Sequence, residues 1–258
     1  MKPATVFLGE MTNAEVEAFL RDHDTVIIPV GATEQHGPHG PLGSDFLVPV
    51  EVARRIAPAI GAVVAPSINY GLSYPHVGFT GVVHVRIPTF MTLIEDIAVS
   101  LATIGFRRLV FLNGHYDNKY PIAFACANAA DRLPDGARAF PISYWDGLTA
   151  DQAAEFLPLH ANRPEVSAVM ALDPDLVDID LANAEMPPFP ETADFAALHA
   201  AFFYSSPGSV YRATQSGTWG DARGSSAEFG ERCLDVYVAA TVRLLDDIER
   251  ANEAMPRR

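Results

Sequence analysis

The hydrophobic positions of the chain follow two different periods. Short, mostly apolar runs, typical of strands buried on both faces of a sheet, occur at residues 25–30, 62–66, 108–112 and 137–142. Around these runs, apolar residues recur every three to four positions, which predicts helices at residues 13–22, 46–59, 89–105, 120–132 and 226–252. Strands that alternate with helices in this way are typical of an α/β fold with a mainly parallel sheet covered by helices.

Local signals refine this division of the chain. Thr12 and Glu15 have the spacing of a capping box, so a helix is expected to begin directly after Thr12. Residues 173–222 are rich in Pro, Asp and Gly and show little periodicity, which predicts long loops over the sheet. The sequence contains no internal repeat, low-complexity tract or interdomain linker, and we expect residues 1–258 to form a single domain.

Composition narrows the possible partners. The net charge of −14 argues against nucleic acid or an anionic membrane as a partner. No apolar stretch reaches the length of a membrane span, and the first residues lack the apolar core of a signal peptide. Cys126 and Cys233 form no CxxC motif and have the neighbours of buried thiols, as expected in a reducing compartment. We therefore expect a soluble, cytoplasmic protein.

Polar residues follow each of the four predicted strands at its carboxyl end. These segments are residues 33–36, 67–73, 113–118 and 143–146. Because sites in open parallel sheets form beyond the carboxyl ends of the strands, we expect the four segments to meet at one edge.

Two of these segments contain side chains that can bind a metal ion. Glu34, His36 and Asp45 lie in a Gly/Pro-rich loop after the first strand, and His115 and Asp117 follow the third strand. Five such donors are enough for two divalent ions if one carboxylate bridges, and the mixed nitrogen and oxygen set suits zinc or manganese. Alternatively, Glu34 or Asp117 caps a helix and His115 satisfies a loop carbonyl, but five donors at strand ends favour a metal site.

Further candidates lie outside this group. His160 is a possible proton shuttle, and Glu165, five residues on, a possible metal ligand or base. The alternative is a surface histidine and a glutamate that stabilises the first turn of a helix. His76 follows the second strand, and the sequence favours a place in the site and a place on the surface equally. Of the other histidines, His39 is expected next to the site. The other three, His84, His23 and His199, are expected to face solvent.

Aromatic residues near the strand ends can form the walls of a pocket. Tyr144 and Trp145 follow the fourth strand, although core packing explains them almost equally well. The predicted substrate-binding residues are Tyr116, Trp145, Tyr74, His76 and Phe156. They suit a small, flat, neutral or cationic molecule, since an acidic protein does not attract anions. The chain has no phosphate-binding glycine loop, dinucleotide fingerprint or nucleophile elbow.

Several segments together resemble the creatininase (creatinine amidohydrolase) family. Residues 31–39, Gly-Ala-Thr-Glu-Gln-His-Gly-Pro-His, with Asp45, resemble the first motif of this family, and residues 113–118, Asn-Gly-His-Tyr-Asp-Asn, resemble the second. Residues 143–146 and 171–178 are similar to creatininase itself. The resemblance covers almost the whole chain.

This resemblance implies a three-layer α/β sandwich with two divalent metal ions per chain, zinc and/or manganese. Glu34 and His115 would hold one ion, His36 the other, and Asp45 would bridge them. Asp117 falls at a glutamate ligand of the family, and His160 and Glu165 fall at a catalytic histidine and a glutamate that family members share. Creatininases form hexamers and open a cyclic amide by the attack of water.

The chain departs from the family pattern in four places, one of which is residues 163–167, where Arg-Pro-Glu-Val-Ser differs from the usual sequence around the glutamate. Asp117 is one methylene shorter than the family's glutamate, Phe156 stands where creatininase has a tryptophan over its substrate, and residues 77–82 lack the usual Phe-Pro-Gly-Thr. The expected function is therefore a binuclear amidohydrolase that cleaves a non-peptide C–N bond in a small cyclic amide. A metal-bridging hydroxide would attack the carbonyl, with His160 as proton shuttle.

Alternatives to this function remain open. Within the family, the alternative is a linear formamide or small-peptide amidase. From other classes, a metal-binding protein without turnover and a metal-dependent isomerase or lyase also fit the residues.

Apolar residues in the segment 179–211 predict association between subunits. Met186, Phe189, Phe195 and the run 202–204 would form a large exposed apolar surface in a monomer. Alternatively, this segment folds back over the sheet as a lid, and the two possibilities are compatible if a neighbouring subunit completes the pocket.

Overall fold

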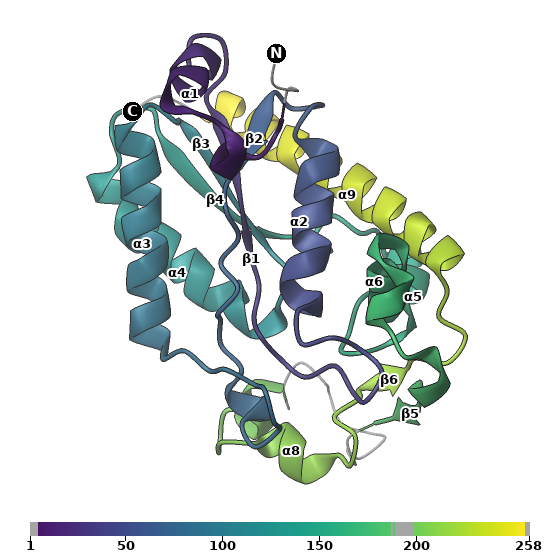
Figure 1. Ribbon diagram of the computed structural model, residues 1–258. Helices are drawn as coiled ribbons and strands as arrows, with labels where there is room; N and C mark the ends of the chain where they lie inside the picture. Colours follow the sequence, from purple (N-terminus) through teal and green to yellow (C-terminus); the bar gives the residue numbers. More distant parts are fainter. Residues whose placement is uncertain (1–4, 187, 189–198, 256–258) are drawn as a thin grey trace.

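The chain folds around a four-stranded parallel sheet (Figure 1), seen in a computed structural model that describes residues 5–186, 188 and 199–255. The strand order is β2-β1-β3-β4, and the strands are Thr25–Val30 (β1), Ala62–Val64 (β2), Arg108–Asn113 (β3) and Arg138–Ser143 (β4). Thr25 pairs with Ala62 on one side and with Arg108 on the other. All six residues of β1 are buried, which explains its unbroken apolar run.

Helices cover both faces of this sheet and complete a three-layer sandwich. The larger helices are Asn13–Phe19 (α1), Ser44–Ile56 (α2), Ile87–Thr103 (α3), Lys119–Ala129 (α4), Arg163–Leu172 (α6) and Ala227–Ala254 (α9). On one face, the apolar stripes of α3 and α4 pack against Val26, Ile28 and Phe111. On the other, α2, α6 and α9 pack against Ile27, Val110 and Leu112. Neighbouring residues of a strand point to opposite faces, so each strand supplies both cores. The predicted fold class is confirmed.

The structure also contains elements that the hydrophobic pattern did not reveal. A short helix, Ala150–Phe156 (α5), begins at a capping box in which Thr149 accepts a hydrogen bond from the backbone of Gln152. The region 173–222, expected to be loops, also contains the strands Ala184–Glu185 (β5) and Gly220–Asp221 (β6), which pair antiparallel, and the helix Ser209–Ala213 (α8). These elements are too short to produce a periodic signal. The capping box at Thr12 is present as predicted.

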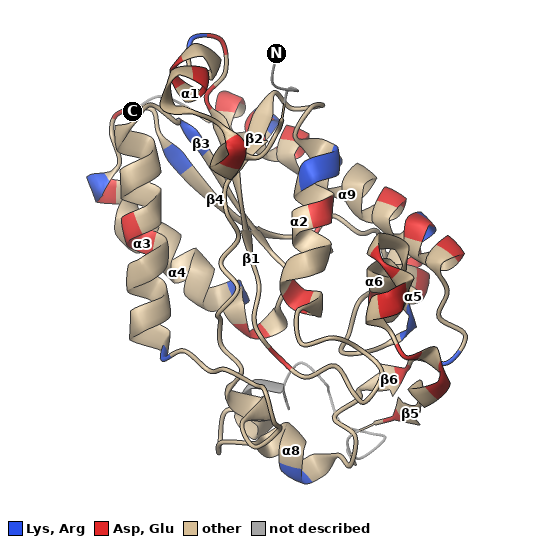
Figure 2. Cartoon of the chain, viewed as in Figure 1, with Lys and Arg blue, Asp and Glu red and all other residues tan. Residues whose placement is uncertain are grey.

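Most acidic side chains of the helices are exposed to solvent, and both cysteines are buried, as the sequence predicted for the thiols. Acidic residues are spread over α1, α3, α5 and α9, where solvent surrounds most of them (Figure 2). Cys126 and Cys233 are buried and unbonded, and burial raises the pKa of each thiol to about 12. Within the described ranges, no helix has the length and hydropathy needed to cross a membrane.

Candidate active site

The carboxyl ends of the strands and the start of α6 bring the ionisable groups of the core together. The described part of the chain buries four carboxylates and five imidazoles, which are Glu34, Asp45, Asp117 and Glu165, and His36, His39, His76, His115 and His160. It buries no Lys or Arg side chain. Buried carboxylates without a compensating cation are costly, so this composition fits a site that holds positively charged ions.

Two glycines allow the first two motifs to approach each other. A Cβ atom on Gly31 would lie 2.4 Å from the carbonyl oxygen of Asp45, and one on Gly114 would lie 2.2 Å from the same oxygen. Both distances are shorter than any real contact of a Cβ atom. The ends of β1 and β3 can therefore reach the beginning of α2 only because these positions carry no side chain.

Two asparagines hold the loops in place. The Asn118 amide accepts the Leu72 N–H at 3.0 Å and donates to the Gly31 carbonyl at 3.0 Å, which joins the loops after three strands. The Asn113 amide accepts the His115 N–H at 3.0 Å and donates to its carbonyl at 2.7 Å. His115 therefore sits on a rigid backbone.

Glu34, Asp45 and His115 form a first group of metal donors. Their donor atoms all lie within 4.8 Å of one another. His115 Nε2 is 3.6 Å from Glu34 Oε2, and His115 Nδ1 is 3.2 Å from Asp45 Oδ2. Asp117 lies on the same side, with Oδ2 4.0 Å from His115 Nε2.

His36, Glu165 and His160 form a second group, with donor atoms within 4.8 Å of one another, on the other side of Asp45. His36 Nε2 is 3.5 Å from Asp45 Oδ1 and 3.6 Å from Glu165 Oε2. The two oxygens of Asp45 thus face different imidazoles, as a bridging carboxylate requires. Both carboxylate oxygens of Glu34, His36 Nε2 and Asp45 Oδ2 are buried without a hydrogen-bond partner among the described residues. Unsatisfied donor atoms that converge on two points fit two metal ions.

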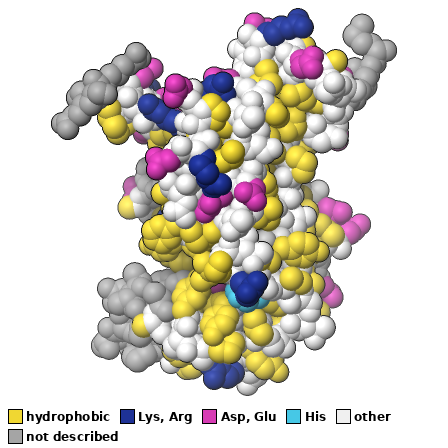
Figure 3. Space-filling model, turned by 90° about the vertical axis from the view of Figure 1, so that its left-hand side faces the viewer, with side chains coloured by type: hydrophobic (Ala, Val, Ile, Leu, Met, Phe, Trp, Pro, Cys, Tyr) yellow, Lys and Arg dark blue, Asp and Glu magenta, His cyan; other side chains and the backbone are white. Residues whose placement is uncertain are grey.

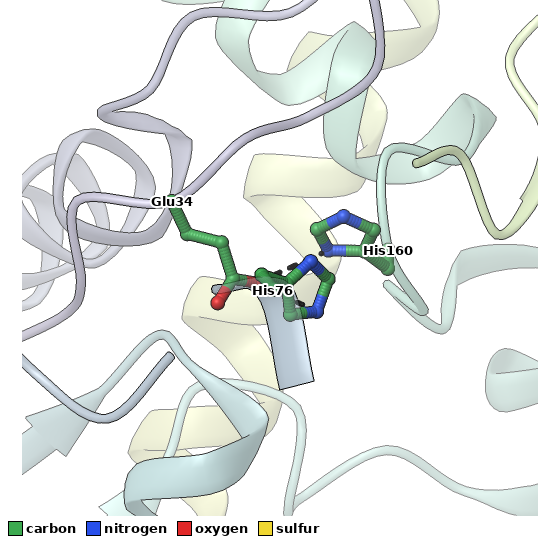
Figure 4. A group of neighbouring side chains, drawn as sticks. All are labelled: Glu34, His76 and His160. Atoms are coloured by element: carbon green, nitrogen blue, oxygen red, sulfur yellow. Dashed lines mark ion pairs between the residues drawn. The ribbon is translucent and has the colours of Figure 1, made fainter. Parts of the chain in front are cut away.

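A third group consists of Glu34, His76 and His160 (Figure 4). Both rings approach the same oxygen, Glu34 Oε1, which lies 3.3 Å from His76 Nε2 and 3.5 Å from His160 Nδ1. The two rings also lie against each other, with centroids 4.5 Å apart.

Burial and mutual interactions raise the pKa of some ionisable groups of the site and lower the pKa of others. Burial raises the pKa of Glu34 to about 8, and repulsion from Asp45 adds to the shift. Burial lowers the pKa of His36 and His115, but the adjacent carboxylates outweigh it and raise both well above the usual value. Burial lowers the pKa of His76 and His160 well below the usual value, because no carboxylate compensates to the same extent.

A strained turn presents His160 to the site. Ala161, the next residue, has a φ of 52°, and it is the one non-glycine residue in the described ranges with a positive φ. Glu165 Oε2 accepts the Ala161 N–H at 2.6 Å, and the His160 carbonyl accepts the Trp219 N–H at 3.0 Å. Strain of this kind persists only where the surroundings impose it, and it is commonly found at functional sites.

These groups line a cavity of about 640 Å³ that opens to solvent. Its walls include Pro75, His76, Tyr116, Trp145, Leu159, Phe203, Val210 and Trp219, together with Glu34, Asp45, His115, Asp117, His160 and Glu165. The rings of Tyr116 and Trp145 are nearly parallel, at 7°, with centroids 6.4 Å apart. The aromatic lining is typical of a site for a small molecule.

Two predicted wall residues lie outside the cavity lining. Tyr74 packs against His84, with ring centroids 5.6 Å apart, and Phe156 stacks on Phe229 in the core. One predicted environment also differs, because His84, which was expected to face solvent, is half-buried and accepts the Ser73 N–H. His39 is buried beside the site, with Nε2 3.2 Å from the Ala161 carbonyl, and His23 is exposed, both as predicted.

Sequence reasoning missed the side of the cavity formed by the region 199–219. Phe203, Val210 and Trp219 line the cavity and pack together. In a segment without periodicity, the sequence does not show which site an aromatic residue contacts. Part of this region therefore covers the site, as the lid interpretation expected, while Phe189 and Phe195 lie outside the described residues.

Comparison with known proteins agrees with this geometry. The family model described as "Creatininase: Creatinine amidohydrolase" matches residues 9–245. A creatinine amidohydrolase from Pseudomonas putida is 34% identical over 255 residues, which cover 91% of this chain and 94% of that protein. A mycofactocin precursor peptide peptidase from Mycolicibacterium smegmatis is 30% identical over 234 residues, which cover 87% and 84%.

A solved structure leads to the same assignment. The structure described as "Creatininase Mn" superposes with a TM-score of 0.81 at 31% identity and covers 95% of this chain and 98% of that one. Another similar creatininase structure is described as of Zn-Zn type. From the motifs, the fold and these similarities, the chain belongs to the creatininase family of hydrolases.

Proposed function

We propose that this protein is a binuclear metal-dependent amidohydrolase that cleaves a non-peptide C–N bond in a small cyclic amide, such as a lactam or a cyclic ureide. The observation that carries the proposal is the position of Asp45, whose two oxygens face His36 and His115 at the bottom of an aromatic cavity. Four buried carboxylates without a buried Lys or Arg support the binding of cations there.

The donor groups suggest which residues would hold each ion. Glu34, Asp45 and His115 would hold one, and His36, Asp45 and Glu165 the other. Asp117 lies nearer to the first group, which supports Glu165 as the ligand that completes the second. Two adjacent divalent ions would activate a water molecule and polarise the substrate carbonyl.

The remaining polar groups of the cavity would transfer protons during hydrolysis. Hydrolysis adds a hydroxyl group to the carbonyl carbon and a hydrogen to the leaving nitrogen. Asp117 and Glu165 line the cavity and are the carboxylates able to accept the proton of the attacking water. His160 also lines the cavity and would help to deliver this proton to the leaving nitrogen.

The walls limit the substrate to a compact amide. Tyr116, Trp145, Phe203 and Trp219 present flat apolar surfaces, and the acidic site disfavours anions. Creatinine is less favoured, because Phe156 packs in the core and leaves the cavity without the aromatic residue that creatininase has at this position. Because one similar protein is a peptidase, a linear amide is the second candidate substrate.

Metal analysis combined with a substrate panel tests this function. We expect roughly two tightly held Zn or Mn ions per chain under metal-replete conditions, and turnover of at least one amide in a panel of creatinine, other lactams, cyclic ureides, formamides and short peptides. Fewer than about one ion per chain, with no gain on adding metal, would refute the binuclear site. Turnover of linear amides alone would replace ring opening with the second candidate.

The exposed apolar surface supports a homo-oligomer, and by family resemblance a hexamer. Tyr120 and Phe124 on α4 are 68% and 60% exposed, and hydrophobic side chains are spread over this side of the molecule (Figure 3). Phe202 and Tyr204, next to the cavity, are partly exposed as well. Surfaces of this kind usually mark interfaces. Light scattering is expected to give a mass above that of the monomer, and a fully active monomer at micromolar concentration would contradict the proposal.

A further inference from the structure

The Gln35 side chain lies behind the third group of ionisable residues and contacts both of its histidines. Gln35 is buried, and its amide nitrogen, Nε2, lies 2.8 Å from His76 Nδ1 and 2.9 Å from His160 Nε2. These ring nitrogens are on the far side of each ring from Glu34. The same Nε2 lies 3.1 Å from the Gly217 carbonyl oxygen.

Two backbone groups determine which end of the Gln35 amide is the nitrogen. Gln35 Oε1 accepts the Gly37 N–H at 2.9 Å. If the amide were turned over, its oxygen would face the Gly217 carbonyl oxygen and its NH₂ group would face the Gly37 N–H. Both contacts would be repulsive, so the NH₂ group must face the two histidines.

An amide NH₂ group donates hydrogen bonds and cannot accept them. Its two hydrogens are shared among three acceptors, the two rings and the Gly217 carbonyl oxygen. A ring N–H aimed at this NH₂ group would be repelled by it, so His76 Nδ1 and His160 Nε2 carry no hydrogen. Each ring then carries its hydrogen on the opposite nitrogen, which is His76 Nε2 or His160 Nδ1. These are the two atoms that lie 3.3 and 3.5 Å from Glu34 Oε1 (Figure 4).

We propose that Gln35 is a positioning residue that fixes the tautomers of His76 and His160, so that both rings present N–H groups toward Glu34 and the cavity. A nitrogen that carries hydrogen cannot bind a metal ion, so Glu34, His76 and His160 do not form a third metal site despite their spacing. The proposal rests on the proposed function where it concerns catalysis, and it narrows the part of His160. The neutral ring donates a hydrogen bond through Nδ1 at the leaving group, and a carboxylate both accepts the proton of water and supplies the proton to the leaving nitrogen.

Nitrogen NMR of the ¹⁵N-histidine-labelled protein, with and without Zn, measures the tautomers directly. We expect hydrogen on Nδ1 of His160 and on Nε2 of His76 in the wild type. Gln35→Met, which keeps the size but removes the donors, should shift both rings to mixed tautomers. The matched control Gln215→Met, an exposed glutamine of the same region, should leave the spectra unchanged. Hydrogen on Nε2 of His160 in the wild type would overturn the proposal.

Metal content and kinetics provide independent tests. We expect kcat of Gln35→Met to fall roughly 10–100-fold with KM and metal content unchanged, as for other residues that orient an active-site histidine. Metal content should also be unchanged in His76→Ala, and the loss of one ion there would establish the third metal site instead. If Gln35→Met fails to fold, Gln35→Glu replaces it, because its carboxylate accepts and should move the hydrogen to His160 Nε2. The tautomers are measurable without turnover, so failure of the proposed function leaves this test valid.

Discussion

Asp45→Ala is expected to remove both metal ions together and to abolish hydrolysis. One oxygen of this carboxylate faces His36 and the other faces His115, so each donor group loses a ligand with a single substitution. Activation of water by metal ions lowers the barrier by several kcal/mol, which corresponds to a fall in kcat of roughly 10³-fold or more. Metal content by elemental analysis and kcat on the best amide of the panel measure the two effects.

A matched substitution and a stability measurement complete this test. Asp96→Ala changes an exposed aspartate on α3 and should leave metal content and kcat unchanged. The metal-free Asp45→Ala protein should melt at a lower temperature than the metal-free wild type, because His36 and His115 lose the carboxylate that both of them face. Retention of one tightly bound ion by Asp45→Ala would show that Asp45 does not bridge.

His160→Ala is expected to lower kcat by roughly 10²–10⁴, the usual contribution of a general acid or base, with metal content unchanged. His160 lines the cavity near His36 and Glu165, but Asp45, His36 and Glu165 would still offer three ligands to the second ion without it. The separation of metal content from activity is therefore the specific result, and it distinguishes this variant from Asp45→Ala. Single-turnover rates and elemental analysis on the same preparation provide the measurement.

The control for this variant is His23→Ala, an exposed histidine beyond α1, which should behave as wild type. A wild-type rate for His160→Ala would remove the residue from the mechanism. Loss of one metal ion from His160→Ala would instead make it a ligand, in agreement with its position near His36 and Glu165.

The order of strands and helices was readable from the sequence because each element is long and strongly patterned. The strand β1 is buried on both faces and reads as an unbroken apolar run, while α3 shows its buried residues at helical spacing. The helix α5 has seven residues, as α1 does, and its signal in the sequence was the capping box at Thr149, which the hydrophobic pattern does not contain. Short elements depend on neighbours for stability, and the pattern carries little of that information.

The site was predictable to the extent that its residues follow strand ends. Glu34, His36, His115 and Asp117 come directly after β1 and β3, and a parallel sheet places such residues together. Glu165 is on α6, far along the chain, and its proximity to His36 depends on the packing of α6 against α2 and α9. Tyr74 and Phe156 were placed by analogy in the pocket, but local packing directs them to His84 and Phe229.

By itself, the sequence determined the α/β fold, the glycine-lined approach of two motifs to Asp45 and the chemical nature of the donor set, because these depend on local pattern and on topology. Only the tertiary structure decided which oxygen faces which imidazole, that Phe203 and Trp219 close the cavity, and that the Gln35 amide lies between His76 and His160. Distances of about 3 Å between segments more than a hundred residues apart result from the packing of the whole core, and no local pattern of residues records them.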